Sequence, residues 1–325
     1  MNRILVIKLS ALGDMVQAMP AFARIRTAHA EAQITLLTTP LYEALARATP
    51  YFDAVETDGR PDDLIGWLNL VRRLRKSRFD RVYDLQANDR THLYFQALRP
   101  SPPLWSGTAW GCSLRHTDPE RMRMHTLERH AQQLEIAGIW PNAPKAPGSA
   151  PPPDLGFLGA RALDPLLQPS PTSRLDARAT KVMIVPGASA RRPEKLWPVQ
   201  RYAELARRLR DRGIQVDVIG GRSERALAQV ITSAAPGARD LTGQTDFSTL
   251  AALATSTALA VGNDTGPMHL LAAAGASCLV LFSATSDPAL CAPRGKVRVL
   301  QSCHLSDLSV DEVWTETLTC LGLRS

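Results

Sequence analysis

The sequence predicts an α/β protein with two domains, each built as a doubly wound parallel sheet. Short aliphatic runs alternate with segments of helical apolar spacing in both halves of the chain, which is typical of such sheets. A length of 325 residues with 45% hydrophobic content is enough for two cores. Because these sheets bind ligands at the carboxyl ends of their strands, the loops after the strands are the candidate functional segments.

The first half begins with a nearly continuous aliphatic run over 3–9, the pattern of a central parallel strand buried on both faces. The chain turns at 10–14, and helical spacing predicts a helix over 15–28, with Pro20 in its first turns, where the missing N–H costs least. Asp14 is therefore expected at the end of the first strand. The other strands are predicted over 33–38, 54–57 and 81–85, and the other helices over 41–48, 63–77 and 92–98.

The helix over 63–77 carries an apolar stripe and ends in a basic cluster at 72–78. This pattern fits contact with an anionic membrane face or with a phosphorylated lipid acceptor. It also fits a core-facing helix whose cations complete its C-terminal dipole, and the stripe favours this second interpretation.

A proline-rich stretch with many Ala, Ser and Gly residues covers about 141–180 and predicts an interdomain linker, with one short helical piece near 158–163. The first domain is accordingly expected over 1–165 and the second over 178–325. The second half alternates in the same way as the first. Its strands are predicted over 181–185, 215–219, 258–261 and 278–282, and its helices over 199–212, 223–234, 248–254 and 309–321.

The segment 262–269 joins a predicted strand to a predicted helix through a glycine-containing turn. Free backbone N–H groups and the helix dipole make such a junction an anion site, and its glycines let a phosphate approach the backbone. The alternative is an ordinary turn in which Asp264 or Thr265 caps the helix. The motif by itself leaves both interpretations open.

The overall charge points to anionic partners. The formal net charge is +7, with arginine spread along the whole chain rather than gathered in a tail. The start of the chain lacks the pattern of an export signal, and no apolar run approaches the ~18 residues of a membrane span, so the cytoplasm is the expected compartment. Nucleic acid is not the expected partner, because no recognition motif or interleaved aromatic pattern occurs.

The motifs exclude some enzyme classes. No G-x-G-x-x-G follows the first strand and no G-x-x-x-x-G-K-[ST] occurs, which argues against a dinucleotide redox enzyme and against a P-loop kinase. The five cysteines are scattered and form no C-x-x-C pair, so neither a structural zinc site nor a disulfide framework is expected.

Several stretches in this order resemble the bacterial lipopolysaccharide heptosyltransferases of glycosyltransferase family nine. They are 4–14 (ILVIKLSALGD), 83–86 (YDLQ), 125–129 (HTLER), 192–198 (RPEKLWP) and 262–269 (GNDTGPMH), so the resemblance covers nearly the whole chain apart from the linker. It implies a GT-B fold, in which two Rossmann-like domains face each other across a cleft. It also implies transfer of heptose from ADP-heptose, with inversion, to the inner core of lipopolysaccharide at the inner face of the cytoplasmic membrane.

The resemblance further implies roles for individual residues. The catalytic residues would be Asp14, as general base, and Lys195, which contacts the donor phosphates. The first domain would bind the acceptor and the second the nucleotide sugar. Donor contacts are expected from Ser189, Lys195, Glu224, Asp264, Thr265, Gly266 and His269, and acceptor contacts from Lys8, Ser10, Gly13 and Gln86. Some relatives carry two threonines before the lysine, where this chain has Ser189 and Ala190, so only Ser189 could supply a hydroxyl.

These residue types suit an inverting transfer. A carboxylate takes the acceptor proton while a cationic site holds the departing diphosphate, and because an aspartate is too weak to deprotonate a sugar alcohol outright, the proton must move late. A lysine ~4 Å from a phosphate contributes about 4 kcal/mol at an effective dielectric near 20, against roughly 0.3–2 kcal/mol for a helix terminus. Lys195 should outweigh the helix, and no metal or other cofactor is expected.

Each role has a structural alternative. Asp14 could cap the following helix, Lys195 could be a solvated lysine, and His269 could simply pack within its helix. The whole chain could be a nucleotide-sugar or solute-binding protein without chemistry, or an inactive member of the family. The acceptor sugar and the oligomeric state stay open, and acceptor recognition is expected in loops around 88–92 and 105–115.

Overall fold

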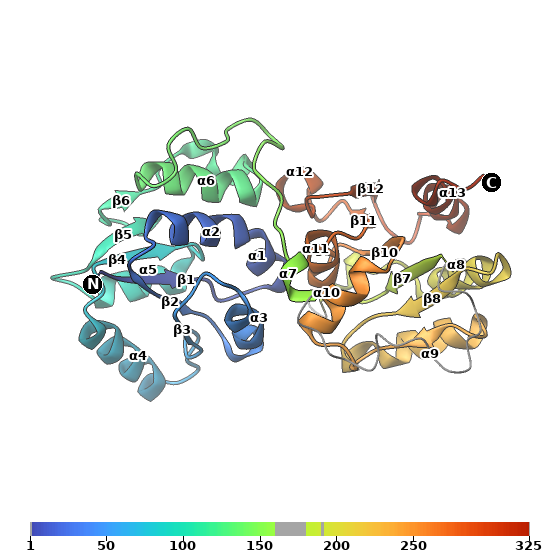
Figure 1. Ribbon diagram of the computed structural model, residues 1–325, viewed down its shortest axis with the longest axis horizontal. Helices are drawn as coiled ribbons and strands as arrows, with labels where there is room; N and C mark the ends of the chain where they lie inside the picture. The colour runs from blue at the N-terminus through green and yellow to red at the C-terminus, as the bar shows by residue number, and fades with distance from the viewer. Residues whose placement is uncertain (1, 160–179, 190–191, 325) are drawn as a thin grey trace. The chain divides into compact units, whose positions relative to one another are not determined.

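A computed structural model describes residues 2–159, 180–189 and 192–324 (Figure 1). The chain divides into two compact units, Met1–Pro152 and Pro153–Ser325, called unit 1 and unit 2 below. The division lies inside the proline-rich stretch. The predicted helical piece near 158–163 is present as α7 (Gly156–Gly159), and its remainder falls outside the described residues. None of the helices in these ranges is long and apolar enough to span a bilayer.

Unit 1 is a six-stranded parallel sheet with the order β3-β2-β1-β4-β5-β6. The strands are β1 (Arg3–Ile7), β2 (Gln33–Leu37), β3 (Ala54–Glu56), β4 (Arg81–Asp84), β5 (Leu104–Gly107) and β6 (Leu114–Arg115). The helices are α1 (Leu12–Gln17), α2 (Met19–Ala28), α3 (Glu43–Ala48), α4 (Leu64–Ser77), α5 (Asp89–Ala97) and α6 (Thr126–Ile136), with 3₁₀ turns at Pro40–Tyr42 and Pro119–Arg123. This strand order is that of a Rossmann fold.

The core of unit 1 lies on both faces of its sheet. Leu5 and Ile7 of β1 belong to a cluster with residues of α4 and α5, on one face. Helices α2 and α6 pack together on the opposite face, above the sheet in Figure 1. Because β1 is central and covered twice, its residues are almost all fully buried, as the aliphatic run predicts.

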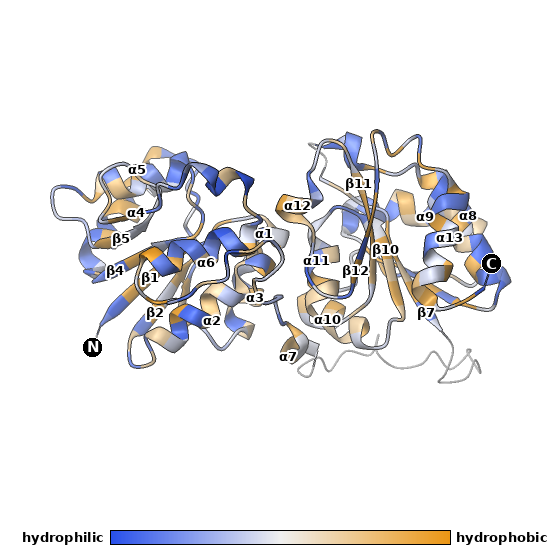
Figure 2. Cartoon of the chain, turned by 90° about the horizontal axis from the view of Figure 1, so that it is seen from above, coloured by the Kyte–Doolittle hydropathy of each residue, from blue (hydrophilic) through white to orange (hydrophobic). Residues whose placement is uncertain are grey.

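Unit 2 repeats this topology, with the order β12-β11-β10-β7-β8-β9. Its strands are β7 (Lys181–Val185), β8 (Gln215–Val218), β9 (Arg239–Asp240), β10 (Leu259–Asn263), β11 (Cys278–Ser283) and β12 (Val297–Ser302). Its helices after α7 are α8 (Val199–Asp211), α9 (Arg225–Ala234), α10 (Phe247–Thr255), α11 (Gly266–Ala273), α12 (Pro288–Cys291) and α13 (Val310–Leu321), with 3₁₀ turns at Pro193–Lys195 and Arg222–Glu224. The central strands β7 and β10 are coloured as hydrophobic in Figure 2. The predicted α/β class is confirmed.

Two helix predictions in unit 1 need correction. The helix predicted over 15–28 is two helices, because the first begins at Leu12 and the second begins at Met19 with Pro20 in its first turn. The helix predicted over 92–98 begins earlier, at Asp89. Asn88 caps it, since its side chain accepts a hydrogen bond from the backbone N–H of Thr91 at 3.2 Å.

Some elements were missed in the sequence. They are β5, β6, β9, α6, α12 and β12. Strand β6 has two residues and α12 has four, so neither is long enough to show a period.

Candidate functional site

In unit 1 the predicted acceptor residues follow β1 and β4, which pair directly at the point where the strand order reverses. Ligands of such sheets bind at this point. The side-chain oxygen Oε1 of Gln86 accepts hydrogen bonds from the backbone N–H groups of Leu9 at 2.9 Å and of Ser10 at 3.2 Å. The Nζ atom of Lys8 donates to the carbonyl oxygen of Leu85 at 3.2 Å. Lys8, Ser10 and Gln86 are therefore held together by contacts between two loops.

Asp14 and Gly13 lie in the first turn of α1, immediately beyond the loop after β1. The Oδ2 atom of Asp14 accepts a hydrogen bond from the backbone N–H of Ala11 at 3.0 Å. Ala11, not Asp14, occupies the N-cap position, but the Asp14 carboxylate still satisfies an N–H group of the helix start. The capping role considered for Asp14 is thus present in this form, and it anchors the carboxylate at the end of the strand.

The surroundings of Asp14 are cationic. Burial lowers the pKa of Lys8, and the negative charge of Asp14 opposes this shift while the charges of Arg129 and Arg121 add to it. Burial likewise lowers the pKa of Arg129, again against the charge of Asp14. A desolvated lysine and two partly buried arginines of unit 1 thus share one electrostatic environment with Asp14, which suits an anionic group on a ligand.

In unit 2 the predicted donor residues other than Glu224 again follow the two strands at which the strand order reverses, β7 and β10. The Nζ atom of Lys195, in the turn Pro193–Lys195, lies 2.5 Å from Oδ2 of Asp264, which directly follows β10. The Nε2 atom of His269, on α11, lies 3.9 Å from Oδ1 of the same carboxylate. Lys195 is therefore not a solvated lysine, since its side chain is only 16% exposed.

The Asp264 carboxylate lies between the side chains of Lys195 and His269. Burial alone would raise the pKa of Asp264, but hydrogen bonds and charges from His269 and Lys195 outweigh burial, so the pKa is lowered. An ionised carboxylate repels a diphosphate, so this geometry places Asp264 as the group that holds Lys195 and His269 rather than as a direct phosphate ligand.

The start of α11 keeps the character of an anion site. Thr265 is its N-cap residue, but no side-chain cap bond is formed there within the described part of the chain. The amides of the first turn and the dipole of this eight-residue helix can therefore serve an anion. Gly262 has a different reason to be glycine, because a Cβ atom there would lie 2.8 Å from Val185 and from the sulfur of Met268. Its role is strand packing, not phosphate approach.

Glu224 lies in the 3₁₀ turn Arg222–Glu224, which follows β8, the neighbour of β7. Its Oε2 atom accepts from the backbone N–H of Gly221 at 2.6 Å, and its Oε1 atom accepts from the hydroxyl of Ser223 at 2.7 Å. A Cβ atom at Gly187, in the loop after β7, would come within 2.7 Å of the Glu224 side chain. Glu224 is therefore close to the loop that carries Ser189, which is exposed, and the predicted donor residues line one edge of this sheet.

No group of three histidine, cysteine, aspartate or glutamate side chains is arranged to hold a metal ion among the residues described.

The comparisons with known proteins agree with one another. Residues 160–308 match the model of glycosyltransferase family 9 (heptosyltransferase). Lipopolysaccharide heptosyltransferase 2 of Escherichia coli K12 is 27% identical to the chain over 321 residues, which cover 93% of this chain and 89% of that protein. The chain is therefore similar to the family 9 heptosyltransferases in its second half and to one such protein along nearly its whole length.

Other matches are more local or concern the fold alone. A Haemophilus influenzae protein provisionally named a glycosyltransferase is 32% identical over 88 residues, and the chain spans a quarter of that protein's length (25%). The solved structure of E. coli ADP-heptose lipopolysaccharide heptosyltransferase II superposes with a TM-score of 0.77 at 23% identity and covers 98% of both chains. The fold is therefore GT-B, with two Rossmann-like units.

Asn263 of this glycosyltransferase was not among the predicted site residues. It is fully buried, and its Oδ1 atom accepts from the backbone N–H of Trp197 and from the hydroxyl of Tyr202, both at 3.0 Å. Its Nδ2 atom donates to the carbonyl oxygens of Pro186 at 2.8 Å and Gly187 at 3.3 Å. One amide thus ties the segment after Lys195, the loop after β7 and the end of β10 together. An asparagine soon after the aliphatic run 258–261 was the signal in the sequence.

Arg121 and Arg129 were not among the predicted site residues either. Arg129 lies on α6 and Arg121 in the turn just before it. Their charges act on Lys8 from segments more than a hundred residues further along the chain, and no local periodic pattern signals such proximity.

Proposed function

We propose that this glycosyltransferase transfers heptose from ADP-heptose, with inversion, to an inner-core sugar of lipopolysaccharide at the inner face of the cytoplasmic membrane. The observation that carries the proposal is the Lys195–Asp264–His269 arrangement beside the open start of α11. The names of the two E. coli relatives, lipopolysaccharide heptosyltransferase 2 and ADP-heptose lipopolysaccharide heptosyltransferase II, supply the donor and the acceptor class.

On the donor side, the leaving group is the diphosphate of ADP. Lys195 is the larger electrostatic contribution, at about 4 kcal/mol for ~4 Å and an effective dielectric near 20, against roughly 0.3–2 kcal/mol for the helix start. Thr265, Gly266 and His269 would hold the diphosphate together with Lys195, and Glu224 would hold the ribose. Because Asp264 holds the lysine in place, the cation is oriented before the donor binds.

On the acceptor side, Asp14 would act as general base. The acceptor hydroxyl oxygen forms a bond to the anomeric carbon while the bond from that carbon to the diphosphate breaks. The hydroxyl proton passes to the Asp14 carboxylate late in this step, and ADP departs with the electron pair. Lys8 and the two nearby arginines, Arg121 and Arg129, suit an acceptor that carries an anionic group next to the reacting hydroxyl.

The direct test is incubation with a panel of nucleotide sugars and truncated core acceptors, with and without a metal chelator, followed by mass analysis of the products. We expect one heptosyl unit to be added only with ADP-heptose and a heptose-accepting core, with the chelator having no effect. Transfer from another nucleotide sugar alone would refute the proposed donor.

The alternative is a binding protein without chemistry. It would bind ADP-heptose in the same panel and yield no glycosylated product with any acceptor, which separates it clearly from the proposed transferase.

A further inference from the structure

Helix α4 presents an outward face that the core of unit 1 does not use. The inward residues, Leu70, Val71 and Leu74, are buried against the sheet. Leu64 is 71% exposed, Ile65 is 72% exposed and Leu68 is 42% exposed. These exposed residues share one side of the helix with three basic residues at spacings of three, four or seven, and this side is called the α4 outer face. The α4 outer face consists of Leu64, Ile65, Leu68, Arg72, Arg75 and Lys76.

The apolar and basic parts of this face are separated along the helix. Its first two turns are apolar and its last two turns are cationic, and no acidic residue occurs within α4. Asp62 and Asp63 precede the helix, and the Asp63 carboxylate already accepts a hydrogen bond from the backbone N–H of Gly66 at 2.7 Å. The core-facing interpretation of the helix therefore holds for its inner side, and its outer side leaves the apolar and basic residues exposed.

Helix α5 extends the surface sideways. The rings of Trp67 on α4 and Tyr94 on α5 lie 5.3 Å apart, and a guanidinium nitrogen of Arg75 donates to the carbonyl oxygen of Ala97 at 2.6 Å. Leu93, on the outer side of α5, is 58% exposed. The two helices therefore form one continuous layer, with a further exposed leucine beside the α4 outer face.

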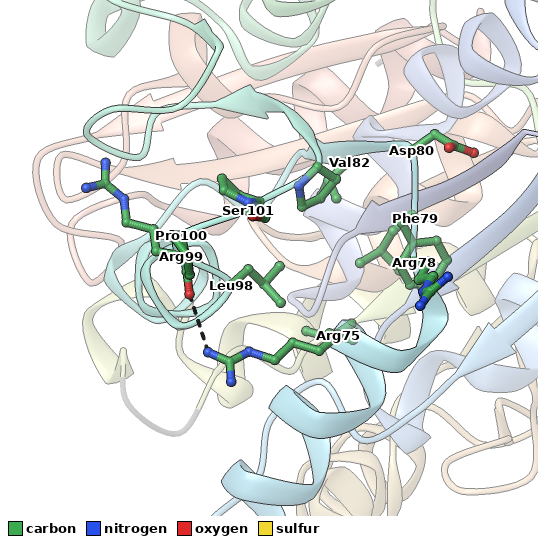
Figure 3. A pocket seen from close by; sticks show the side chains of 13 residues that line it. Arg75, Arg78, Phe79, Asp80, Val82, Leu98, Arg99, Pro100 and Ser101 are labelled. Atoms are coloured by element: carbon green, nitrogen blue, oxygen red, sulfur yellow. Dashed lines mark hydrogen bonds between the residues drawn. The ribbon is translucent and has the colours of Figure 1, made fainter.

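A cavity of about 560 Å³ opens at the cationic end of α4, between the end of that helix and the segment that follows α5. Figure 3 shows Arg75 and Arg78 from the α4 side and Arg99 from the α5 side around it. The one carboxylate in its lining, that of Asp80, accepts a hydrogen bond from the backbone N–H of Arg3 at 2.7 Å.

The positive side-chain charge around this cavity is larger than the negative charge at the C-terminal ends of the α4 and α5 dipoles. Three arginines and one aspartate line it, which leaves +2 on the side chains. The dipole of each helix places about −0.5 elementary charge at its C-terminus, so α4 and α5 together offset about one positive charge. Roughly one positive charge remains uncompensated. The cavity is therefore suited to an anionic group.

We propose that the α4 outer face lies on an anionic phospholipid bilayer, with lipid phosphates at Arg72, Lys76 and the cavity and the exposed leucines and isoleucine among the acyl chains. Exposed aliphatic side chains beside unpaired cations are the composition of interfacial helices, and a bilayer offers apolar and anionic chemistry together. The reason for such docking rests on the proposed function, because the acceptor of that reaction is itself a lipid.

The test is co-sedimentation of the full chain with vesicles of phosphatidylcholine alone and with added phosphatidylglycerol. We expect binding to the anionic vesicles and little binding to the neutral ones. The double variant Arg72→Gln, Lys76→Gln should lower partitioning into anionic vesicles by about tenfold or more, because two surface cations are lost. The double variant Leu64→Glu, Ile65→Glu should lower it at least as much.

Matched variants in unit 2 serve as controls. Lys296→Gln with Arg212→Gln removes the same charge, and Val230→Glu with Leu323→Glu changes two exposed aliphatic residues. Equal loss in these controls would show only a net-charge or solubility effect and would overturn the proposal, as would wild-type binding to neutral and anionic vesicles alike.

Transfer to a soluble, lipid-free acceptor provides a separate readout. The α4 variants should match the wild type there and lose activity only toward acceptor embedded in vesicles. A wild type that binds vesicles but transfers no sugar would refute the proposed function and leave the docking surface standing. A wild type that transfers sugar but does not bind anionic vesicles would refute the docking surface alone.

Discussion

The variant Asp14→Asn should lower the rate of heptose transfer by a factor on the order of 10²–10⁴, which is the usual contribution of a general base. Its affinity for ADP should stay within about twofold of the wild-type value. The amide keeps an oxygen that can accept the N–H of Ala11, so the start of α1 is preserved while the proton acceptor is lost. Turnover should be measured with ADP-heptose and a soluble core acceptor, and ADP affinity by calorimetry.

A second acidic residue in the same helix position gives the control. Glu312 lies in the first turn of α13, and its carboxylate accepts the backbone N–H of Ser309 at 2.8 Å, as Asp14 does for Ala11. The variant Glu312→Gln should transfer heptose at the wild-type rate. Wild-type turnover by Asp14→Asn, or an equal loss in both variants, would remove Asp14 from the chemistry.

The variant Lys195→Ala should cost on the order of 10²–10³ in the rate of transfer, because the departing diphosphate loses its largest electrostatic partner. It should also weaken ADP binding, since the same charge acts on the bound nucleotide. The loss leaves Asp264 with one cation fewer, which raises its pKa and costs about 1–3 kcal/mol of folding free energy. Rates, calorimetric ADP affinity and urea unfolding should therefore be measured together.

Lys181 supplies the matched control for this variant. It is at the opposite end of β7 from the loop of Lys195, and its Nζ atom donates to the hydroxyl of Ser256 at 3.3 Å. The variant Lys181→Ala should change neither rate nor ADP affinity appreciably. A change of less than threefold in the rate of Lys195→Ala would show that the phosphates are held elsewhere.

Much of the fold could be predicted from local patterns. Aliphatic runs correctly predicted β1 and β7, and the apolar stripe with Asp63 before it predicted α4 almost to the residue. The alternation of strands and helices in both halves predicted the α/β class, because each crossover helix must cover a face of the sheet. The break at Ala18 was missed because apolar spacing continues across it.

The candidate site could be predicted only in part. The sequence placed Lys195 and Asp264 at strand ends, but their 2.5 Å contact joins segments 69 residues apart, and local spacing carries no such information. The same holds for Asn263, whose four hydrogen bonds reach three separate segments. The roles of these residues in catalysis stay predictions. The structure shows that Lys195, Asp264 and His269 lie in one cluster.

The anomeric configuration of the wild-type product tests the central claim most directly. If Asp14 takes the proton as the acceptor attacks and the diphosphate leaves from the opposite face, a single displacement must invert the anomeric carbon. Nuclear magnetic resonance of the product formed from ADP-heptose and a heptose-accepting core should show the configuration opposite to that of the donor. A product with the donor's own configuration would contradict this account.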